Sequence, residues 1–187
     1  MNNLQKLFIS LPLAALGIMA GSCNKDDDNW DTYEEWRDTN SAYYDEQKYT
    51  LTAEGTPFYE TLTPVWNSSA EILVRYLNDR KLTEGNLSPL LTSTVDVKYI
   101  GRLYNGVAFD SSYLQTANGD SIFRTRPNEL IQGWTIALLN MRVGDSVRIV
   151  VPYTLGYGNS SQGVIPPYST LVFDMKLVDI PYYELKP

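Results

Sequence analysis

The residue types of the chain restrict the chemistry that it can perform. Among 187 residues there is no histidine and only one cysteine. Ser–His–Asp catalysis, Cys–His catalysis and histidine-ligated zinc are therefore excluded. The chain instead contains 14 Tyr, 5 Phe and 4 Trp. Aromatic side chains can build an apolar pocket that excludes water, in which a few polar groups orient a ligand. Such a chain can catalyse a reaction that needs this kind of pocket and no nucleophile.

Charge and composition narrow the class of protein further. The net charge is −7, and no basic stripe is present that could replace the counterions of a phosphate backbone, so nucleic acid is excluded as a partner. A hydrophobic content of 43% and a charged content of 20% are ordinary for a folded domain. The length suits one domain with extensions.

The elements that could position such a pocket are clearest in residues 129–178. After Leu130, Ile131, Gly133 and Trp134 comes a run, closed by Met141, that is too short for more than about two helical turns. Residues 146–151 alternate, with Val150 on the polar face, and 171–177 alternate as well. Period-two runs bounded by turn residues indicate half-buried antiparallel strands. One short helix among such strands predicts an α+β domain, with an antiparallel sheet curled around the helix.

Two more alternating segments precede this stretch. Residues 95–103 form the first clear strand, and Asn105-Gly106 directly after them is a strong hairpin signal. Residues 72–77 alternate too, although the pattern alone does not separate strand from helix. The polar residues 115–121 are expected to form a loop facing solvent.

Seven short motifs in this order resemble the FKBP family of peptidyl-prolyl isomerases. They are Val97-x-Tyr99-x-Gly101-x-Leu103-x-x-Gly106, Phe109-Asp110-Ser111-Ser112, Ile131-x-Gly133-Trp134, Met141-x-Val143-Gly144, Tyr157-Gly158, Ile165-Pro166-Pro167 and Thr170-Leu171-Val172-Phe173. A lone Pro-Pro or Tyr-Gly would mean nothing, but seven motifs in register are hard to produce by chance. The resemblance implies an FKBP-like domain at residues 71–187 and favours a strand at 72–77.

The activity that the resemblance implies fits a chain without histidine. Rotation about an X–Pro bond crosses a barrier of roughly 18–20 kcal/mol that is set by amide resonance. Crossing it requires a site that binds the twisted amide better than either planar form, and no nucleophile, metal or cofactor. The twisted amide is less delocalised, so an apolar pocket that excludes water favours it.

The resemblance also assigns site residues. Those assigned to catalysis are Asp110, Tyr157, Trp134 and Phe109. Those assigned to substrate binding are Tyr99, Leu130, Ile131, Val164, Ile165 and Phe173. Trp134 would form the floor of the pocket, and the other aromatic side chains, apart from Tyr157, its walls. For an isolated aromatic residue, core packing is the alternative role.

Three polar groups would orient the substrate. The Ile131 N–H and the Tyr157 hydroxyl would each bond a substrate carbonyl, and Asp110 at the pocket edge would polarise or orient the peptide. No proton transfer is needed, so Asp110 is not expected to act as an acid or base. The alternative for Asp110 is a carboxylate that stabilises the turn by capping Ser112 or its neighbours.

The chain departs from the family pattern in two loops. The loop between Asp110 and Ile131 is longer than in small members, and the family's usual aromatic there aligns with Ser121, with Phe123 at a neighbouring position. The loop at 159–163 is shorter and lacks the histidine often found in it. We expect these changes to alter sequence preference and affinity for macrolide inhibitors more than catalysis.

The N-terminus has the pattern of an export signal. Lys6 is followed by an apolar run too short to span a bilayer, for which about 20 residues are needed. Small residues directly before Cys23 resemble the lipobox of bacterial lipoproteins, in which the cysteine is acylated with chains such as palmitate. We therefore expect a lipoprotein signal peptide at 1–22 and lipidation of Cys23. A secreted protein with an incidental cysteine is the alternative.

Residues 23–29 and 30–70 would link this anchor to the domain. An acidic tether is expected at 23–29, where Lys25 and three aspartates resemble a surface-export signal of some Gram-negative lipoproteins. An extension, partly helical, is expected at 30–70. Asp31 and Glu34 resemble a capping box, which predicts a helix from Asp31 to about residue 48. Its aromatic side chains should pack on the domain or on a neighbouring chain.

Two functional interpretations follow. The first is an isomerase that rotates X–Pro bonds in secreted or envelope proteins, assists their folding, and is held by lipid to the outer membrane of a Gram-negative bacterium, exposed at the cell surface. The alternative is an FKBP-like binding module with weak or no catalysis. Proline-containing polypeptides are the expected partners in both, and macrolide inhibitors bind the family.

Overall fold

A computed structural model describes residues 25–182 of the chain. The expected signal peptide at 1–22 and Cys23 lie outside the described residues. None of the helices within the described range combines the length and the apolar composition needed to cross a membrane.

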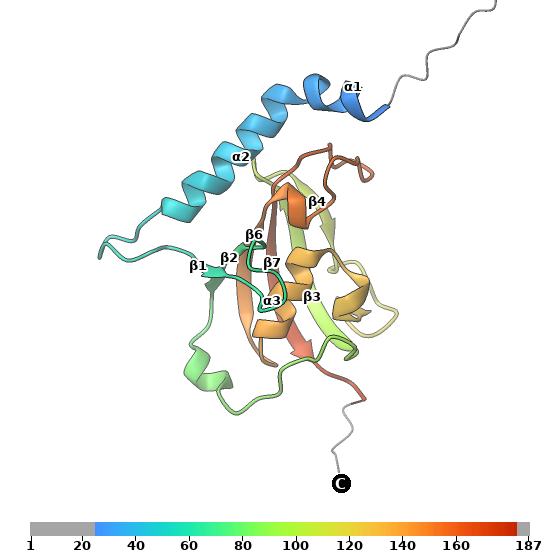
Figure 1. Ribbon diagram of the computed structural model, residues 1–187. Helices are drawn as coiled ribbons and strands as arrows, with labels where there is room; N and C mark the ends of the chain where they lie inside the picture. Colours follow the sequence, from blue (N-terminus) through green and yellow to red (C-terminus); the bar gives the residue numbers. More distant parts are fainter. Residues whose placement is uncertain (1–24, 183–187) are drawn as a thin grey trace, which may run out of the picture.

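The domain is built on one antiparallel sheet of seven strands (Figure 1). The strands are β1 (Glu60–Leu62), β2 (Ile72–Tyr76), β3 (Val95–Leu103), β4 (Ala108–Ser111), β5 (Phe123–Thr125), β6 (Ser146–Val151) and β7 (Leu171–Asp179). Their order across the sheet is β1-β2-β6-β7-β3-β4, and β5 pairs with β3. The sheet therefore begins at Glu60, inside the segment that the sequence analysis assigned to the extension.

The predictions for the strands are confirmed where the alternation is clear. β3 and β6 have the predicted bounds, and β2 ends one residue earlier than predicted. The hairpin signal is also confirmed: Gly106 has a φ of +86° in the turn that pairs Arg102 with Ala108. A left-handed conformation of this kind costs glycine little because it has no Cβ.

One short helix fills the concave face of the sheet. α3 (Gln132–Asn140) has nine residues, about two and a half turns. Gly133 lets the helix approach the sheet closely, because a Cβ there would lie 2.4 Å from a methyl of Val151. Trp134, Ile136 and Leu138 are buried against the inward faces of the strands. The fold class is the predicted one, an antiparallel sheet curled around one short helix.

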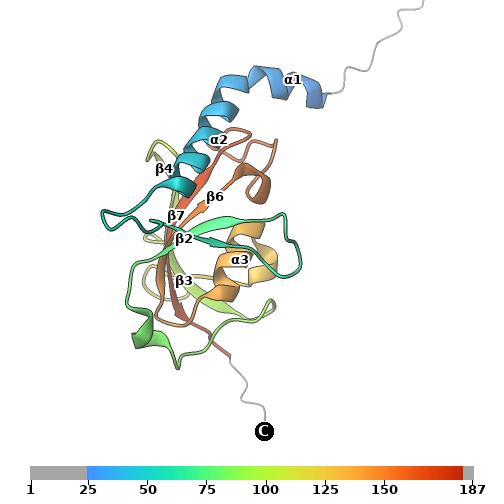
Figure 2. The same cartoon turned by 60° about the vertical axis from the view of Figure 1, so that its left-hand side comes forward.

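A second, smaller core lies on the opposite face of the sheet. It consists of Tyr44, Tyr59, Leu73, Val150 and Val172. The prediction that Val150 shares a polar face was wrong, since its side chain is 0% exposed. The reason is a helix that covers this face, α2 (Glu34–Tyr49), to which Tyr44 belongs (Figure 2).

The start of this helix differs from the prediction. A separate helix, α1 (Lys25–Thr32), contains Asp31, and α2 begins after Tyr33 with no side-chain cap. The proposed capping box was therefore wrong, because the chain is already helical at Asp31. Helix α1 also includes residues 25–29 of the expected tether. Of the two packing arrangements expected for the helical aromatics, on the domain or on a neighbouring chain, Tyr44 shows the first.

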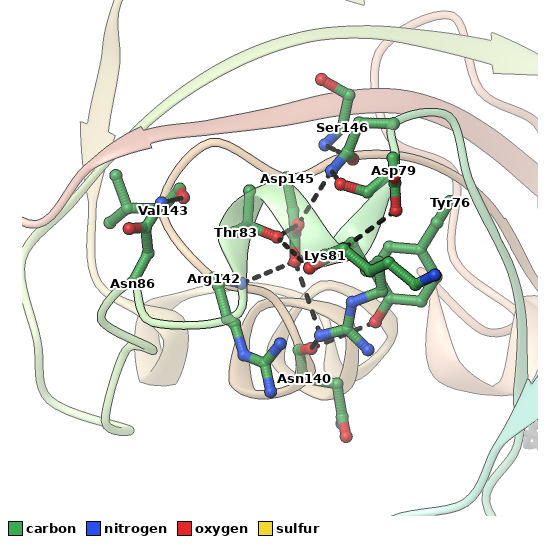
Figure 3. A network of polar contacts seen from close by, with 12 residues as sticks. Tyr76, Asp79, Lys81, Thr83, Asn86, Asn140, Arg142, Val143, Asp145 and Ser146 are labelled. Atoms are coloured by element: carbon green, nitrogen blue, oxygen red, sulfur yellow. Dashed lines mark hydrogen bonds and ion pairs between the residues drawn. The ribbon is translucent and has the colours of Figure 1, made fainter.

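Short 3₁₀ turns complete the connections, at η1 (Arg80–Thr83), η2 (Pro127–Glu129) and η3 (Tyr153–Leu155). Figure 3 shows how η1 is joined to the turn before β6 through the buried carboxylate of Asp145. The Thr83 hydroxyl donates to this carboxylate over 2.6 Å and the Arg142 N–H over 2.8 Å. Tyr76 and Arg80 also donate to the carbonyl of Asn140, so the network contacts the C-terminal end of α3.

Candidate active site

The first turn of α3 places an indole at the centre of an aromatic cluster. Trp134 is 4% exposed and its ring meets Tyr99 at 4.9 Å and Phe173 at 5.2 Å, both nearly perpendicular. Perpendicular rings bring the positive edge of one ring to the negative face of the other, worth about 0.5–1.5 kcal/mol per pair beyond burial. The indole is therefore held by rings from β3 and β7.

This cluster leaves a cavity of about 190 Å³, which we call the aromatic cavity. Its lining side chains are Tyr99, Asp110, Phe123, Glu129, Leu130, Ile131, Trp134, Tyr157 and Phe173. The strands supply the walls, the start of α3 supplies the floor, and the segment entering the helix supplies one edge. Apolar walls with a few polar groups are typical of a site that binds an extended or compact apolar ligand.

The carboxylate of Asp110 is fixed by two hydrogen bonds. The Tyr99 hydroxyl donates to Oδ2 over 2.6 Å, and the Ser111 N–H donates to Oδ1 over 2.7 Å. The second bond is the turn-stabilising contact weighed from the sequence, found one residue before Ser112. The first points to a further role, because it joins Asp110 to a wall of the cavity.

The tyrosine hydroxyls in the cavity are held in their protonated form. Burial, the hydrogen bond to Asp110 and its charge raise the pKa of Tyr99. Burial and the charge of Asp110 also raise the pKa of Tyr157. Both hydroxyls therefore stay donors at neutral pH. Within the described residues, the Tyr157 hydroxyl and the Ile131 N–H have no hydrogen-bond partner in the protein, so both are available to a ligand.

A second hollow of about 360 Å³ adjoins the aromatic cavity and shares Asp110 and Tyr157 with it. The other residues lining this adjoining cavity are Phe109, Gln162, Gly163, Val164 and Ile165. Val164 is 75% exposed, whereas Ile165 is buried. The two cavities together give a continuous lining on both sides of Asp110.

The ten residues assigned from the sequence thus fall into two groups. The aromatic cavity brings together Tyr99, Asp110, Leu130, Ile131, Trp134, Tyr157 and Phe173. Phe109, Val164 and Ile165 line the adjoining cavity instead. Phe109 still reaches the cluster, because its ring meets Phe173 edge-on at 5.7 Å.

The loop aromatic expected at Ser121 is supplied by Phe123. Phe123 lies on β5, lines the aromatic cavity and packs edge-on against Tyr99 at 5.5 Å. Ser121 lines neither cavity; it is buried and has a φ of +62°, which contradicts the prediction that it faces solvent. A phenylalanine at Ser121 would meet a strained, enclosed position instead of adding a wall. The pairing of β5 with β3 is what brings Phe123 to the site.

Sequence reasoning missed Glu129, Gln162 and Gly163 among the lining residues. Each lies within two positions of a residue that was assigned, namely Leu130 or Val164. Proximity along the chain to an assigned residue was the only sequence feature that could have pointed to these three residues. Glu129 ends the 3₁₀ turn before α3, and this turn brings its side chain to the edge of the aromatic cavity.

Comparison with known proteins agrees with this geometry. Residues 86–178 match the model of the FKBP-type peptidyl-prolyl cis-trans isomerases. This domain belongs to the FKBP family. All ten assigned site residues lie inside the matched range, whereas α1, α2 and the first two strands of the FKBP-like fold lie before it.

Curated relatives of the FKBP domain come from distant organisms. The macrophage infectivity potentiator of Trypanosoma cruzi is 45% identical over 97 residues, which cover 51% of this chain and 47% of that protein. The FKBP-type peptidyl-prolyl cis-trans isomerase FkpA of Escherichia coli K12 is 39% identical over 103 residues, or 54% of this chain and 37% of FkpA. The chain thus spans less than half the length of these relatives.

Solved structures show the same FKBP-like architecture. A peptidyl-prolyl cis-trans isomerase of Pseudomonas syringae superposes with a TM-score of 0.61 at 27% identity, covering 79% of this chain and 94% of that one. Escherichia coli FkpA superposes with a TM-score of 0.52 at 28% identity, covering 82% and 60%. Each superposition covers a larger part of this chain than residues 86–178 do, so the structural similarity extends beyond the family match.

Proposed function

We propose that the protein is a peptidyl-prolyl cis-trans isomerase that rotates X–Pro bonds in secreted or envelope proteins and so assists their folding. The observation that carries the proposal is the aromatic cavity, in which Trp134, Tyr157 and Ile131 line one space beside Asp110. The FKBP-type relatives support the same activity.

The cavity favours rotation through binding. A proline ring enters the space bounded by Trp134 and the surrounding rings and loses its water there. The planar amide is the more polar form because resonance separates its charge, so it loses more hydration than the twisted amide. Hydrogen bonds from Tyr157 and Ile131 hold the peptide carbonyls on either side of the rotating bond while the bond turns. Binding the twisted amide more tightly than the planar forms lowers the barrier.

The full-length protein is expected to accelerate the cis-to-trans relaxation of short X–Pro peptides. Tyr157→Phe should lower kcat/KM about three- to tenfold, because one hydrogen bond to the substrate is lost. Tyr49→Phe is the matched control, since Tyr49 is an exposed tyrosine outside both cavities and should leave kcat/KM unchanged. The three proteins are compared in the same peptide assay, with circular dichroism to establish that each is folded.

If the wild type is active and Tyr157→Phe keeps the same kcat/KM as Tyr49→Phe, the Tyr157 hydroxyl does not contribute to catalysis. A folded wild type that accelerates no peptide, across several residues before proline, would leave an FKBP-like binding module as the function. Affinity for a macrolide of the kind that binds the family, measured by calorimetry, then tests whether the cavity is still a binding site.

We propose further that lipid on Cys23 anchors the protein to the outer membrane of a Gram-negative bacterium, with the domain exposed at the cell surface. The support is the sequence pattern before and after Cys23. Several acyl chains on one cysteine bury enough methylene groups for stable anchoring. The domain would then meet clients as they emerge at the envelope.

Cys23→Ser is expected to abolish labelling of the protein by palmitate and to move it from the membrane fraction to the soluble fraction. Ser22→Ala is the control, because it keeps a small residue before Cys23 and should leave labelling unchanged. Palmitate labelling and fractionation of cells that express each variant measure the effect. Labelling that persists in Cys23→Ser would contradict lipidation at this cysteine.

A further inference from the structure

The loop between β6 and β7 forms part of both cavities and also touches the N-terminal helix. We call residues 157–170 the rim loop; it carries Tyr157, Val164 and Ile165. Figures 1 and 2 both place α2 beside this loop. We propose that α2, through Asn40 and Trp36, is a positioning element that holds the rim loop in its substrate-binding conformation. The inference rests on the proposed isomerase function and extends it to residues outside the family match.

Asn40 makes the deepest contact between α2 and the rim loop. Its side chain is 0% exposed. The Thr170 N–H donates to its Oδ1 over 2.8 Å, and the Thr170 hydroxyl donates to its backbone carbonyl over 2.9 Å. The Asn40 amide nitrogen donates in turn to the carbonyl of Trp36 over 2.7 Å, which fixes the rotamer. A buried polar side chain satisfied in this way specifies one arrangement of the two segments.

Trp36 adds a relay that reaches toward the cavity. Its indole N–H donates to the Ser169 hydroxyl over 3.1 Å, and that hydroxyl donates to the carbonyl of Pro166 over 2.7 Å. Pro166 directly follows Ile165, which lines the adjoining cavity. Two hydrogen bonds therefore join the helix to the residue next to the site.

Tyr168 shows that the rim loop needs outside support. Its φ of +59° is a left-handed conformation that is costly for a tyrosine, about 1–3 kcal/mol, and persists only where surrounding contacts impose it. Its ring is buried between Trp30 of α1, at 5.6 Å, and Tyr153, at 5.4 Å. Its N–H donates to the carbonyl of Gly158 over 2.8 Å, and Gly158 follows Tyr157. Tyr168 thus joins the helical extension to the part of the rim loop that carries Tyr157.

Through these contacts α2 stabilises the conformation of the rim loop that can bind substrate, and so raises the fraction of molecules in that conformation. If the loop leaves this conformation for part of the time, the apparent affinity for substrate falls by the fraction that remains competent. The chemistry of the competent molecules is unchanged, so kcat at saturation is retained while KM rises. A role limited to global stability would leave both constants unchanged in the folded protein.

The test compares four variants of the full-length protein. Thr170→Val removes the hydroxyl bond to Asn40 and keeps the shape of the side chain, and Thr170→Ser keeps the bond. Asn40→Ala removes the side-chain acceptor of the Thr170 N–H and keeps the backbone carbonyl to which the Thr170 hydroxyl donates. Tyr44→Phe is the matched control on the same helix, because it removes the hydrogen bond from Tyr44 to the carbonyl of Glu71, away from the rim loop. Affinity for one short X–Pro peptide is measured by NMR titration, and kcat/KM by the relaxation assay.

We expect Thr170→Val and Asn40→Ala to weaken peptide affinity about fivefold and to lower kcat/KM by the same factor. Thr170→Ser and Tyr44→Phe should bind and catalyse as the wild type does. Wild-type affinity in folded Thr170→Val would overturn the inference. The comparison of Thr170→Val with Thr170→Ser decides it even if Asn40→Ala does not fold. A wild type that binds the peptide without accelerating it would remove the proposed function, and the affinities would still test the inference. No binding by the folded wild type would overturn both.

Discussion

Replacing Asp110 by alanine is expected to lower kcat/KM for X–Pro peptides about 10- to 100-fold while leaving the protein folded. The carboxylate lies where both cavities meet and accepts the Tyr99 hydroxyl over 2.6 Å. Its removal therefore frees one wall of the cavity and deletes a charge that both cavity linings share.

The charge itself should account for part of the loss. A planar amide carries more negative charge on its oxygen than a twisted one, because resonance feeds the oxygen. A fixed carboxylate near this oxygen disfavours the planar form relative to the twisted one, and the apolar rings around it weaken screening. Asp110→Asn keeps the acceptor for Tyr99 but removes the charge, so it should lie between the wild type and Asp110→Ala.

The matched control is Asp120→Ala. Asp120 carries an exposed carboxylate on the loop after β4, where it pairs loosely with Lys98 at 3.8 Å. This variant should keep wild-type kcat/KM, and thermal unfolding establishes that all three variants are folded under assay conditions. Wild-type activity in folded Asp110→Ala would show that Asp110 is a turn carboxylate only, which its bond from the Ser111 N–H would then explain.

How much of the fold and the site could be predicted from the sequence depended on how far apart along the chain the interacting residues lie. β3 and β6 were predicted with their bounds because alternation is a local pattern that a half-buried strand must show. The chain positions of Trp134 and Asp110 followed from short motifs for the same reason. Their meeting in one cavity came from resemblance to a family, since β3 and α3 are joined only by tertiary packing.

Contacts between distant segments were not visible in the sequence. Val150 was placed on a polar face because Ser146 and Arg148 share its period, yet α2 covers that face and buries it. Phe123 reaches the cavity because β5 pairs with β3, and no local sequence pattern predicts this pairing. The bonds from Asn40 to Thr170 span 130 residues, and an asparagine in a polar helix gives no sign of them.

The buried carboxylate of Asp145 is the clearest case, because no local pattern around it predicts burial. The side chain is fully buried. It accepts hydrogen bonds from Asn78, Thr83 and the Arg142 N–H, at 3.2, 2.6 and 2.8 Å. The Arg80 guanidinium lies 3.6 Å away and forms an ion pair with it. A carboxylate can be buried at acceptable cost only when its lone pairs are satisfied in this way.

Asp145→Ala is accordingly expected to lower the free energy of unfolding by about 3–5 kcal/mol, since it removes the ion-pair partner of Arg80 and the buried acceptor shared by Asn78, Thr83 and the Arg142 N–H. For a domain of this size the melting temperature should fall by about 10 °C. Calorimetry or thermal circular dichroism measures the change. Glu54→Ala, which removes an exposed carboxylate on the turn between α2 and β1, is the control and should shift stability by less than about 0.5 kcal/mol.

A double-mutant cycle then separates the network from simple loss of packing. Thr83→Val removes the hydroxyl that donates to Asp145 and keeps its shape. If the two side chains act together, the double variant should lose at least about 0.5 kcal/mol less than the sum of the single losses. Strict additivity would mean that the 2.6 Å bond contributes little. Below its melting temperature Asp145→Ala should retain wild-type kcat/KM, because its network supports the C-terminal end of α3, whereas Trp134 lies in the first turn.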